Sequence, residues 1–274
     1  MSDTITHIIN EDKAAEAFSK QSTVFDALYG ANAIIKYKRE RVRSHVEAFL
    51  PANSTILELN AGTGEDAVYF AQKGHIIHAT DIAAGMQQQL RDKAQQAGLN
   101  NYISTETCSF TQLEQLHNKG PYNLIFSNFA GLNCTGELDK VMDSFFPLLK
   151  PGGVVTMVIM PGFCLWETLL ALRGNFKNAF RRFNSRKGVV ANVEGMQFLC
   201  WYYKPSYIIN YLKNTFTPLS VEGLCSIVPP SYFEGFPAKH PVLYKKLQAY
   251  ENKYKSSWPW KYCGDYFIIS LRKK

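Results

Sequence analysis

A short apolar strand that runs into a glycine-rich turn and a helix constrains this chain more than any other feature. Residues Thr55 to Leu59 predict a buried strand, Gly62-Thr-Gly64 follows as a turn, and a helix is expected from about Glu65 to Gln72. Glycines at 62 and 64 lack the side chains that would block a ligand from approaching the backbone. Open α/β sheets bind ligands at the carboxyl ends of their strands, so the turn predicts a nucleotide site.

The order of the other elements predicts the architecture. Strands are expected at 75–80, 102–107, 122–128 and 154–160, with helices at 84–96 and 138–149 between them. Strands that alternate with helices at this spacing form a right-handed, largely parallel, doubly wound sheet. Two late strand-like runs, 219–228 and 265–271, are expected to form a hairpin at the far edge of that sheet.

Charge is distributed unevenly along the 274 residues. Residues 1–150 carry 13 Lys and Arg against 17 Asp and Glu, whereas residues 151–274 carry 17 against 6. The basic second half is able to attract an acidic partner, but no nucleic-acid motif accompanies it, so nucleic-acid binding is not expected. The six cysteines form no C-x-x-C pair, which predicts reduced core thiols and no metal site. With no apolar run of about 18 to 20 residues and several acids among the first twenty, we expect a cytoplasmic protein.

Acidic residues around the turn bear on the choice of nucleotide. The run from Gly62 to Ala67 fits the dinucleotide pattern G-x-G-x-x-A, and Asp81 lies where a ribose-binding acid belongs. That spacing alone does not separate a nicotinamide dinucleotide from S-adenosylmethionine. Glu58, at the end of the strand before the turn, repels a pyrophosphate and attracts the methionyl ammonium of S-adenosylmethionine. Glu65 and Asp66, in the first turn of the helix, act in the same direction.

These residues resemble the class I S-adenosylmethionine-dependent methyltransferases, in which an acidic residue precedes G-x-G after the first strand. The resemblance covers roughly residues 20 to 160. It continues through Asp81, Cys108-Ser109-Phe110, Asn128 and the Leu149-Lys-Pro-Gly-Gly153 run. It implies a Rossmann-like, seven-stranded, mostly parallel sheet with a reversed terminal strand, and S-adenosylmethionine as the cofactor.

The same resemblance implies roles for individual residues. Gly62 and Gly64, with Asn60 and Ala61 of the same turn, would flank the methionyl group that Glu58 attracts. Asp81 would bind the ribose hydroxyls and Ile82 would pack on the adenine. Ser109 and Phe110 would border the adenine edge, with Asn128 following the fourth strand nearby, and Tyr29 would fold over the cofactor. Asn60 departs from the glycine usual in the family, so either the turn is shifted or Asn60 adopts the left-handed conformation.

The resemblance also suggests how the chain is divided. We expect a helical cap at 1–50, with short helices at 14–18 and 23–28 and a longer one at 33–49. A cofactor-binding core at 51–160, a helical, aromatic and basic lid at 161–215, and a strand pair at 216–274 that completes the sheet would follow. The stretch 163–183 has helical apolar spacing with one basic face, which would pack on the sheet or meet an anionic membrane surface or an acidic carrier protein.

The aromatic residues of the lid imply a hydrophobic methyl acceptor that is aromatic or lipid-like. His240, the only histidine in the basic half, and Tyr29 are candidate catalytic residues, although a histidine before Pro241 is more often structural. Two alternatives stay open. The first is an NAD(P)-dependent oxidoreductase, favoured by the G-x-G-x-x-A match, and the second is a non-catalytic module in which the Asn60-bearing site is vestigial.

Overall fold

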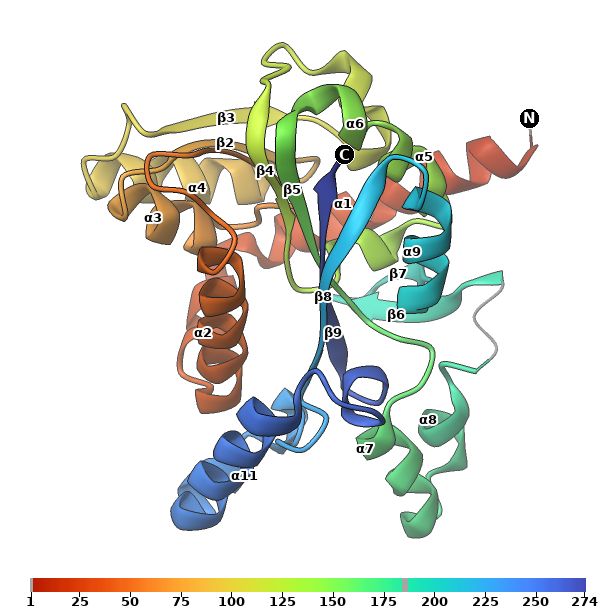
Figure 1. Cartoon of the computed structure of the whole chain (residues 1–274). Helices are drawn as coiled ribbons and strands as arrows, with labels where there is room; N and C mark the ends of the chain where they lie inside the picture. The colour runs from red at the N-terminus through yellow and green to blue at the C-terminus, as the bar shows by residue number, and fades with distance from the viewer. Residues whose placement is uncertain (1, 184–186) are drawn as a thin grey trace.

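One seven-stranded sheet organises the chain in the computed structural model, which describes residues 2–183 and 187–274 (Figure 1). The strand order is β3-β2-β1-β4-β5-β9-β8. All neighbours pair in parallel except β9, which is antiparallel to both β5 and β8. The strands are β1 Thr55–Leu59, β2 Ile76–Asp81, β3 Ile103–Thr107, β4 Tyr122–Ser127, β5 Leu149–Ile159, β8 Phe216–Leu224 and β9 Tyr266–Lys273. The predicted fold class, with its reversed strand, is confirmed.

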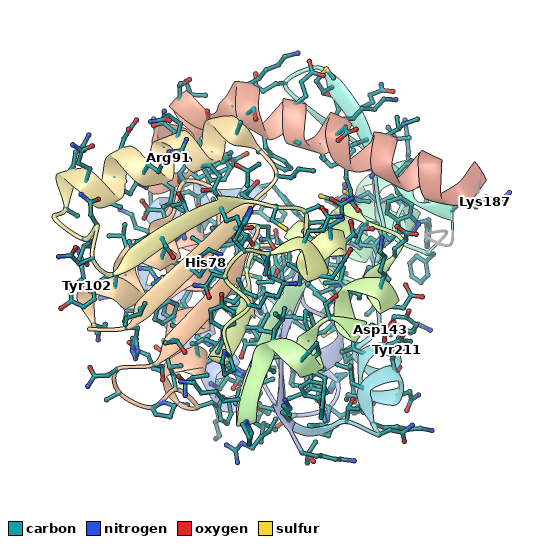
Figure 2. The ribbon with its side chains drawn as sticks, turned by 90° about the horizontal axis from the view of Figure 1, so that it is seen from above. His78, Arg91, Tyr102, Asp143, Lys187 and Tyr211 are labelled. Carbon is teal, nitrogen blue, oxygen red and sulfur yellow. The ribbon has the colours of Figure 1, made fainter. Side chains whose placement is uncertain are left out.

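Helices cover both faces of the sheet, because the central strands are apolar on both sides. One face packs against α2 (Ala33–Glu47), α3 (Glu65–Gln72) and α4 (Ala84–Gln96), through residues such as Val42, Phe70 and Leu90. The other face packs against η1 (Phe110–Gln115), α5 (Leu138–Asp143), α6 (Phe145–Leu148) and α9 (Pro205–Leu212). Figure 2 shows Tyr211 of α9 beside Asp143 of α5, where the two side chains share a hydrogen bond of 2.8 Å.

The first thirty residues differ from the prediction. Instead of two short helices, a single helix α1 (Ser2–Gly30) packs on α4 and on a two-stranded hairpin, β6 (Val189–Val193) and β7 (Met196–Cys200). The hairpin was not predicted, so the description of 161–215 as helical was wrong in part. Asn10 connects α1 to the hairpin, since its side chain accepts from the Leu199 amide at 2.6 Å and donates to the Leu199 carbonyl at 3.1 Å.

The predicted helix at 163–183 is broken into short pieces. These are α7 (Leu165–Thr168), η3 (Leu169–Arg173) and α8 (Phe176–Phe180). Gly174, which lies between η3 and α8, has a φ of 75°, a left-handed conformation that ends a helix. The other elements of the described residues are η2 Gly131–Cys134, η5 Ser231–Phe233, α10 Phe236–Lys239, α11 Pro241–Tyr254 and η6 Trp260–Tyr262. Within the described part of the chain, no helix is long and apolar enough to cross a membrane.

Candidate functional site

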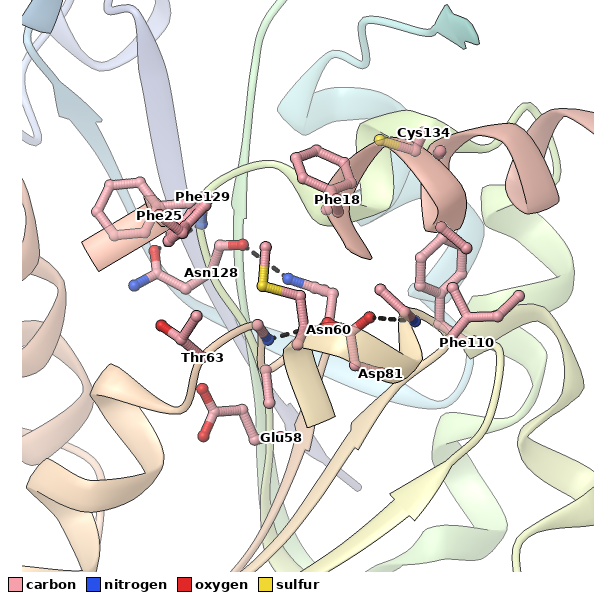
Figure 3. A pocket seen from close by; sticks show the side chains of 18 of the residues that line it. Phe18, Phe25, Glu58, Asn60, Thr63, Asp81, Phe110, Asn128, Phe129 and Cys134 are labelled. Carbon is pink, nitrogen blue, oxygen red and sulfur yellow. Dashed lines mark hydrogen bonds between the residues drawn. The ribbon is translucent and has the colours of Figure 1, made fainter. Parts of the chain in front are cut away.

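A partly open cavity lies at the carboxyl ends of β1, β2 and β4, beneath α1. Its wall combines the glycine turn and the ends of these strands with aromatic side chains, which surround Asn60 and Asp81 in Figure 3. The aromatic residues are Phe18 and Phe25 of α1, Phe110 of η1 and Phe129 after β4. Strand order explains the position, because the carboxyl ends of parallel strands meet at one edge of the sheet.

Glu58 is buried at the cavity wall, with 3% of its surface exposed. Its Oε2 atom has no hydrogen-bond partner among the described residues. Burial raises the pKa of this carboxyl well above its ordinary value, and the Asp66 carboxylate raises it further, whereas Arg39 lowers it. An unpaired buried carboxyl oxygen is costly, so this atom matches a ligand that brings a donor or a positive charge.

Asp66, in the first turn of α3, anchors the polar side of the cavity. Its Oδ1 accepts from Arg43 at 2.7 Å, and its Oδ2 accepts from Arg39 at 3.2 Å and from the Asn128 amide at 2.7 Å. The two arginines come from α2, so the cap helix fixes both the start of α3 and the end of β4. The sequence indicated Asp66 as a favourable charge, but gave no signal that Arg39 and Arg43 would pair with it.

Asp81 ends β2 and shapes the turn that follows β1. Its Oδ2 accepts from the Gly62 amide at 2.9 Å and its Oδ1 accepts from the Ala83 amide at 2.8 Å. Burial raises the pKa of Asp81, and these backbone hydrogen bonds oppose that shift. Each oxygen keeps a lone pair for a ligand hydroxyl.

Asn60 adopts the left-handed conformation, with a φ of 46°, rather than shifting the turn. Its side chain donates to the Asn128 carbonyl at 2.9 Å and accepts from the Ser127 hydroxyl at 2.6 Å. A Cβ atom added to Gly131 would overlap the Asn60 side chain. Asn60 therefore bridges the ends of β1 and β4, and glycine at 131 leaves the room that this bridge needs.

Ser109, predicted at the adenine edge, does not line the cavity itself. Its hydroxyl donates to Oε2 of Glu11 at 2.6 Å, and the Thr111 hydroxyl donates to the same oxygen at 2.9 Å. Glu11, which comes from α1, does line the cavity. The sequence carried no signal for Glu11, because its partners lie about a hundred residues further along the chain.

Most of the predicted cofactor residues meet at the cavity. Glu58, Asn60, Ala61, Gly62, Asp81, Ile82, Phe110 and Asn128 all line it. Gly64 lies just behind, at the start of α3, where an added Cβ would meet Leu90. Tyr29 lines a neighbouring surface hollow with Phe25 and Arg39, and His240 lies by the exposed start of α11. His75 and His78 are buried, and His78, labelled in Figure 2, contacts Ser104 and Glu106.

One cluster of metal-type ligands occurs among the described residues, away from the cavity. Cys164, Glu167 and Asp265 bring their ligand atoms within 4.8 Å of one another. Glu167 and Asp265 are both paired with the buried Arg182, Glu167 at a contact distance of 2.6 Å and Asp265 at 2.8 Å. A guanidinium between two carboxylates takes the place that a cation would occupy, so the cluster is an ion-pair network.

Part of the chain is similar to a known domain family. Residues 56–153 match the family described as a methyltransferase domain. The S-adenosyl-L-methionine-dependent Diels-Alderase of Talaromyces variabilis is 34% identical over 110 residues, which cover 40% of this chain and 37% of that protein. The tRNA 5-carboxymethoxyuridine methyltransferase of Escherichia coli (strain K12) is 24% identical over 155 residues, covering 54% of this chain and 55% of that protein. The chain thus matches about half or less of the length of these relatives.

Solved structures show the same fold over nearly the whole chain. The 1,6-didemethyltoxoflavin-N1-methyltransferase of Burkholderia thailandensis, solved with bound 1,6-didemethyltoxoflavin and S-adenosylhomocysteine, superposes with a TM-score of 0.57 at 14% identity. That match covers 96% of this chain and 88% of the other. Together with the reversed β9, these findings favour a methyltransferase fold over the oxidoreductase alternative.

Proposed function

Since the chain carries a methyltransferase domain within a class I methyltransferase fold, we propose that it binds S-adenosylmethionine beneath α1 and methylates a hydrophobic small molecule. The acceptor atom is an oxygen, nitrogen or carbon of an aromatic or lipid-like compound. The observation that carries this proposal is the buried Oε2 of Glu58, which has no partner among the described residues and lies in the same cavity as Asp81.

The residues present fit this cofactor. Glu58 would hold the methionyl ammonium, because opposite charges attract strongly where water is excluded. Asp81 would accept hydrogen bonds from the ribose hydroxyls, and Gly62 would let the ligand approach the backbone. Ile82 and Phe110 would enclose the adenine. When bound, the sulfonium group of the cofactor supplies an activated methyl group.

The apolar part of the cavity supports a hydrophobic acceptor. Phe18, Phe25 and Phe129 line it, and apolar walls with few polar groups are typical of sites for such ligands. Among the described residues of the lining there is no histidine, lysine or tyrosine. We propose that the chain's main contribution to the reaction is to position the acceptor beside the methyl group and to exclude water. A base role for His240 or Tyr29 stays a prediction.

A second function is favoured by the Diels-Alderase relative, which shares 34% identity over 110 residues. A cavity of this kind is also suited to folding an apolar polyene for cyclisation, since that reaction needs no proton-transfer group. The two functions differ in what happens to the cofactor. Methyl transfer converts S-adenosylmethionine to S-adenosylhomocysteine, whereas cyclisation leaves it intact. The non-catalytic alternative predicts cofactor binding with neither outcome.

Calorimetry with S-adenosylmethionine, S-adenosylhomocysteine and NAD tests the cofactor first. We expect binding of the two adenosyl ligands and none of NAD, and binding of NAD alone would refute the proposal. Mass spectrometry of a panel of hydrophobic phenols, amines and polyenes then tests the reaction. A product heavier by one methyl group, formed together with S-adenosylhomocysteine, supports methyl transfer, and an isomer of the substrate supports cyclisation.

We further propose that the basic half of the chain delivers the protein to an anionic membrane that holds the acceptor. Exposed apolar side chains follow one another from η3 to just beyond α8, beside Lys177 and the half-exposed Arg181. They are Leu169, Leu172, Phe176, Phe180 and Phe183. Sedimentation with anionic and neutral vesicles tests this, using Leu172→Asp as the variant and the exposed Ile76→Asp, on β2, as control. Capture by an acidic carrier protein without vesicle binding would contradict it.

A further inference from the structure

A carboxylate from α1 is buried at the carboxyl end of β3, where the cofactor assignment did not require one. Glu11 is 6% exposed and lines the cavity. Its Oε2 accepts hydrogen bonds from the hydroxyls of Ser109 and Thr111, whereas its Oε1 is buried and has no partner among the described residues. Burying an acceptor without a donor is unfavourable, so Oε1 marks a place for a ligand donor.

The position of Glu11 is fixed on both sides. Its neighbour Asn10 is held by the backbone of Leu199 and donates to the Cys134 carbonyl at 2.8 Å. Ala14 and Ala17, one and two turns further along α1, are buried against the hairpin and η2. The two hydroxyl groups then orient the carboxylate itself. Oε1 is thus held in place by the same contacts that dock α1.

Three carboxyl groups follow one another along the edge of the sheet. Neighbouring strands are ordered β3, β2, β1, and these hold Glu11 (through Ser109), Asp81 and Glu58 at their carboxyl ends. S-adenosylmethionine carries its hydrogen-bond donors in a matching order. The exocyclic amine of adenine lies at one end, the two ribose hydroxyls in the middle and the methionyl ammonium at the other end. Once Asp81 takes the ribose and Glu58 the ammonium, the amine is the donor that remains.

We propose that Oε1 of Glu11 accepts a hydrogen bond from the exocyclic amine of adenine and thereby selects adenine over hypoxanthine. The inference rests on the proposed cofactor and assigns the base-recognition group within its site. The selectivity follows from the chemistry of the group, because a carboxylate accepts hydrogen bonds and donates none. Hypoxanthine presents a carbonyl oxygen at the same position, which a carboxylate repels. A site with a fixed acceptor therefore discriminates more strongly than an apolar pocket would.

The test compares S-adenosylhomocysteine with S-inosylhomocysteine by calorimetry on the full chain. The wild-type protein is expected to bind the adenosyl ligand at least about tenfold more tightly, the size of one hydrogen bond to a charged group. In Glu11→Gln the preference should fall to about threefold or less, because an amide N–H is able to donate to the hypoxanthine carbonyl. Glu16→Gln, on the same helix but exposed and paired with Lys20, should keep the wild-type ratio.

Each result decides between the alternatives. Equal wild-type affinities for the two ligands would overturn the inference, and that measurement needs no variant to fold. An unchanged ratio in a folded Glu11→Gln protein would overturn it as well. If Glu11→Gln does not fold, Ser109→Ala replaces it. Loss of one of the two hydroxyls that orient Glu11 should lower the ratio, and an unchanged ratio counts against the inference. Failure of the wild-type protein to bind S-adenosylhomocysteine would instead refute the proposed function.

Discussion

The Asp81 carboxylate accepts the backbone N–H of Gly62 at 2.9 Å and so ties the end of β2 to the glycine turn after β1. The same carboxylate lines the cavity. A single side chain therefore shapes the turn and lines the cavity. The proposed ribose-binding role of Asp81 and its structural role in the turn have the same geometric origin, because β1 and β2 are neighbours in the sheet.

Replacing Asp81 by Ala should weaken the binding of S-adenosylhomocysteine by about 1–3 kcal/mol, since ribose hydroxyls lose their acceptor and the turn loses a restraint. Calorimetry measures the change. Asp92→Ala is the control, because the Asp92 side chain lies on α4 and its carboxylate contacts Gln88 on the exposed side of that helix. Unchanged affinity in Asp81→Ala would mean that the ribose site lies elsewhere.

Cofactor affinity should rise with pH because of Glu58. Burial and the Asp66 carboxylate raise the pKa of this carboxyl in the free protein well above its ordinary value. A bound ammonium favours the charged carboxylate and lowers that pKa. Binding therefore releases a proton, and affinity increases by up to about tenfold per pH unit between the lowered pKa of the complex and the raised pKa of the free protein. Calorimetry in buffers of different ionisation enthalpy measures the release, which should disappear in Glu58→Gln.

The bridge between Asn60 and β4 should show in stability measurements. Asn60→Ala keeps the strain of the left-handed backbone conformation and loses the hydrogen bonds to Ser127 and Asn128. The free energy of unfolding should therefore fall by about 2 kcal/mol. Gly131→Ala should also destabilise the protein, because the new methyl group overlaps Asn60. The double variant Asn60→Gly with Gly131→Ala removes that overlap. Urea denaturation should therefore show that Gly131→Ala lowers stability less in the Asn60→Gly background than in the wild-type protein.

The stability of the fold at acid pH should depend on Glu222 of β8. Burial alone would raise the pKa of Glu222, but hydrogen bonds and charge from His45 and Lys255 outweigh it and lower the pKa to about 2. A carboxyl whose pKa is depressed by folding stabilises the fold when the pH is above its pKa in the unfolded chain. That contribution is lost as the pH falls toward the folded pKa of about 2. Glu222→Gln should cost about 2 kcal/mol at neutral pH, and the difference should vanish near the folded pKa. The exposed Glu234→Gln should show no such pattern.

The elements set by local sequence were predictable. Strand β1 and helix α3 have the predicted bounds, because an apolar run, a glycine turn and a glycine stop determine them within one segment. The left-handed conformation of Asn60 was one of two alternatives, and only the partners on β4 decide between them. The meeting of Glu58 and Asp81 followed from the parallel order of the strands.

The features that were missed differ in whether the local sequence carried a signal for them. The hairpin β6–β7 had one, since Glu194 and Gly195 form a two-residue turn with positive φ at both positions, but its strands are short and mixed in polarity. The break at Gly174 also had a signal in that glycine. Glu11 had none. Its partner Ser109 lies 98 residues away, so only the docking of α1 on the sheet edge reveals the pair.

Helix α1 supplies Glu11, Phe18 and Phe25 to the cavity wall and is held there by Asn10 and its contacts with the hairpin. Occupancy of the cavity and docking of this helix are therefore thermodynamically linked. A ligand seated against these side chains should slow hydrogen exchange along α1. A binding partner that draws α1 away from the cavity lowers the affinity for the ligand, and the ligand lowers the affinity for that partner by the same factor. The docking of this helix is therefore a point at which a ligand in the cavity and a partner bound to α1 influence each other.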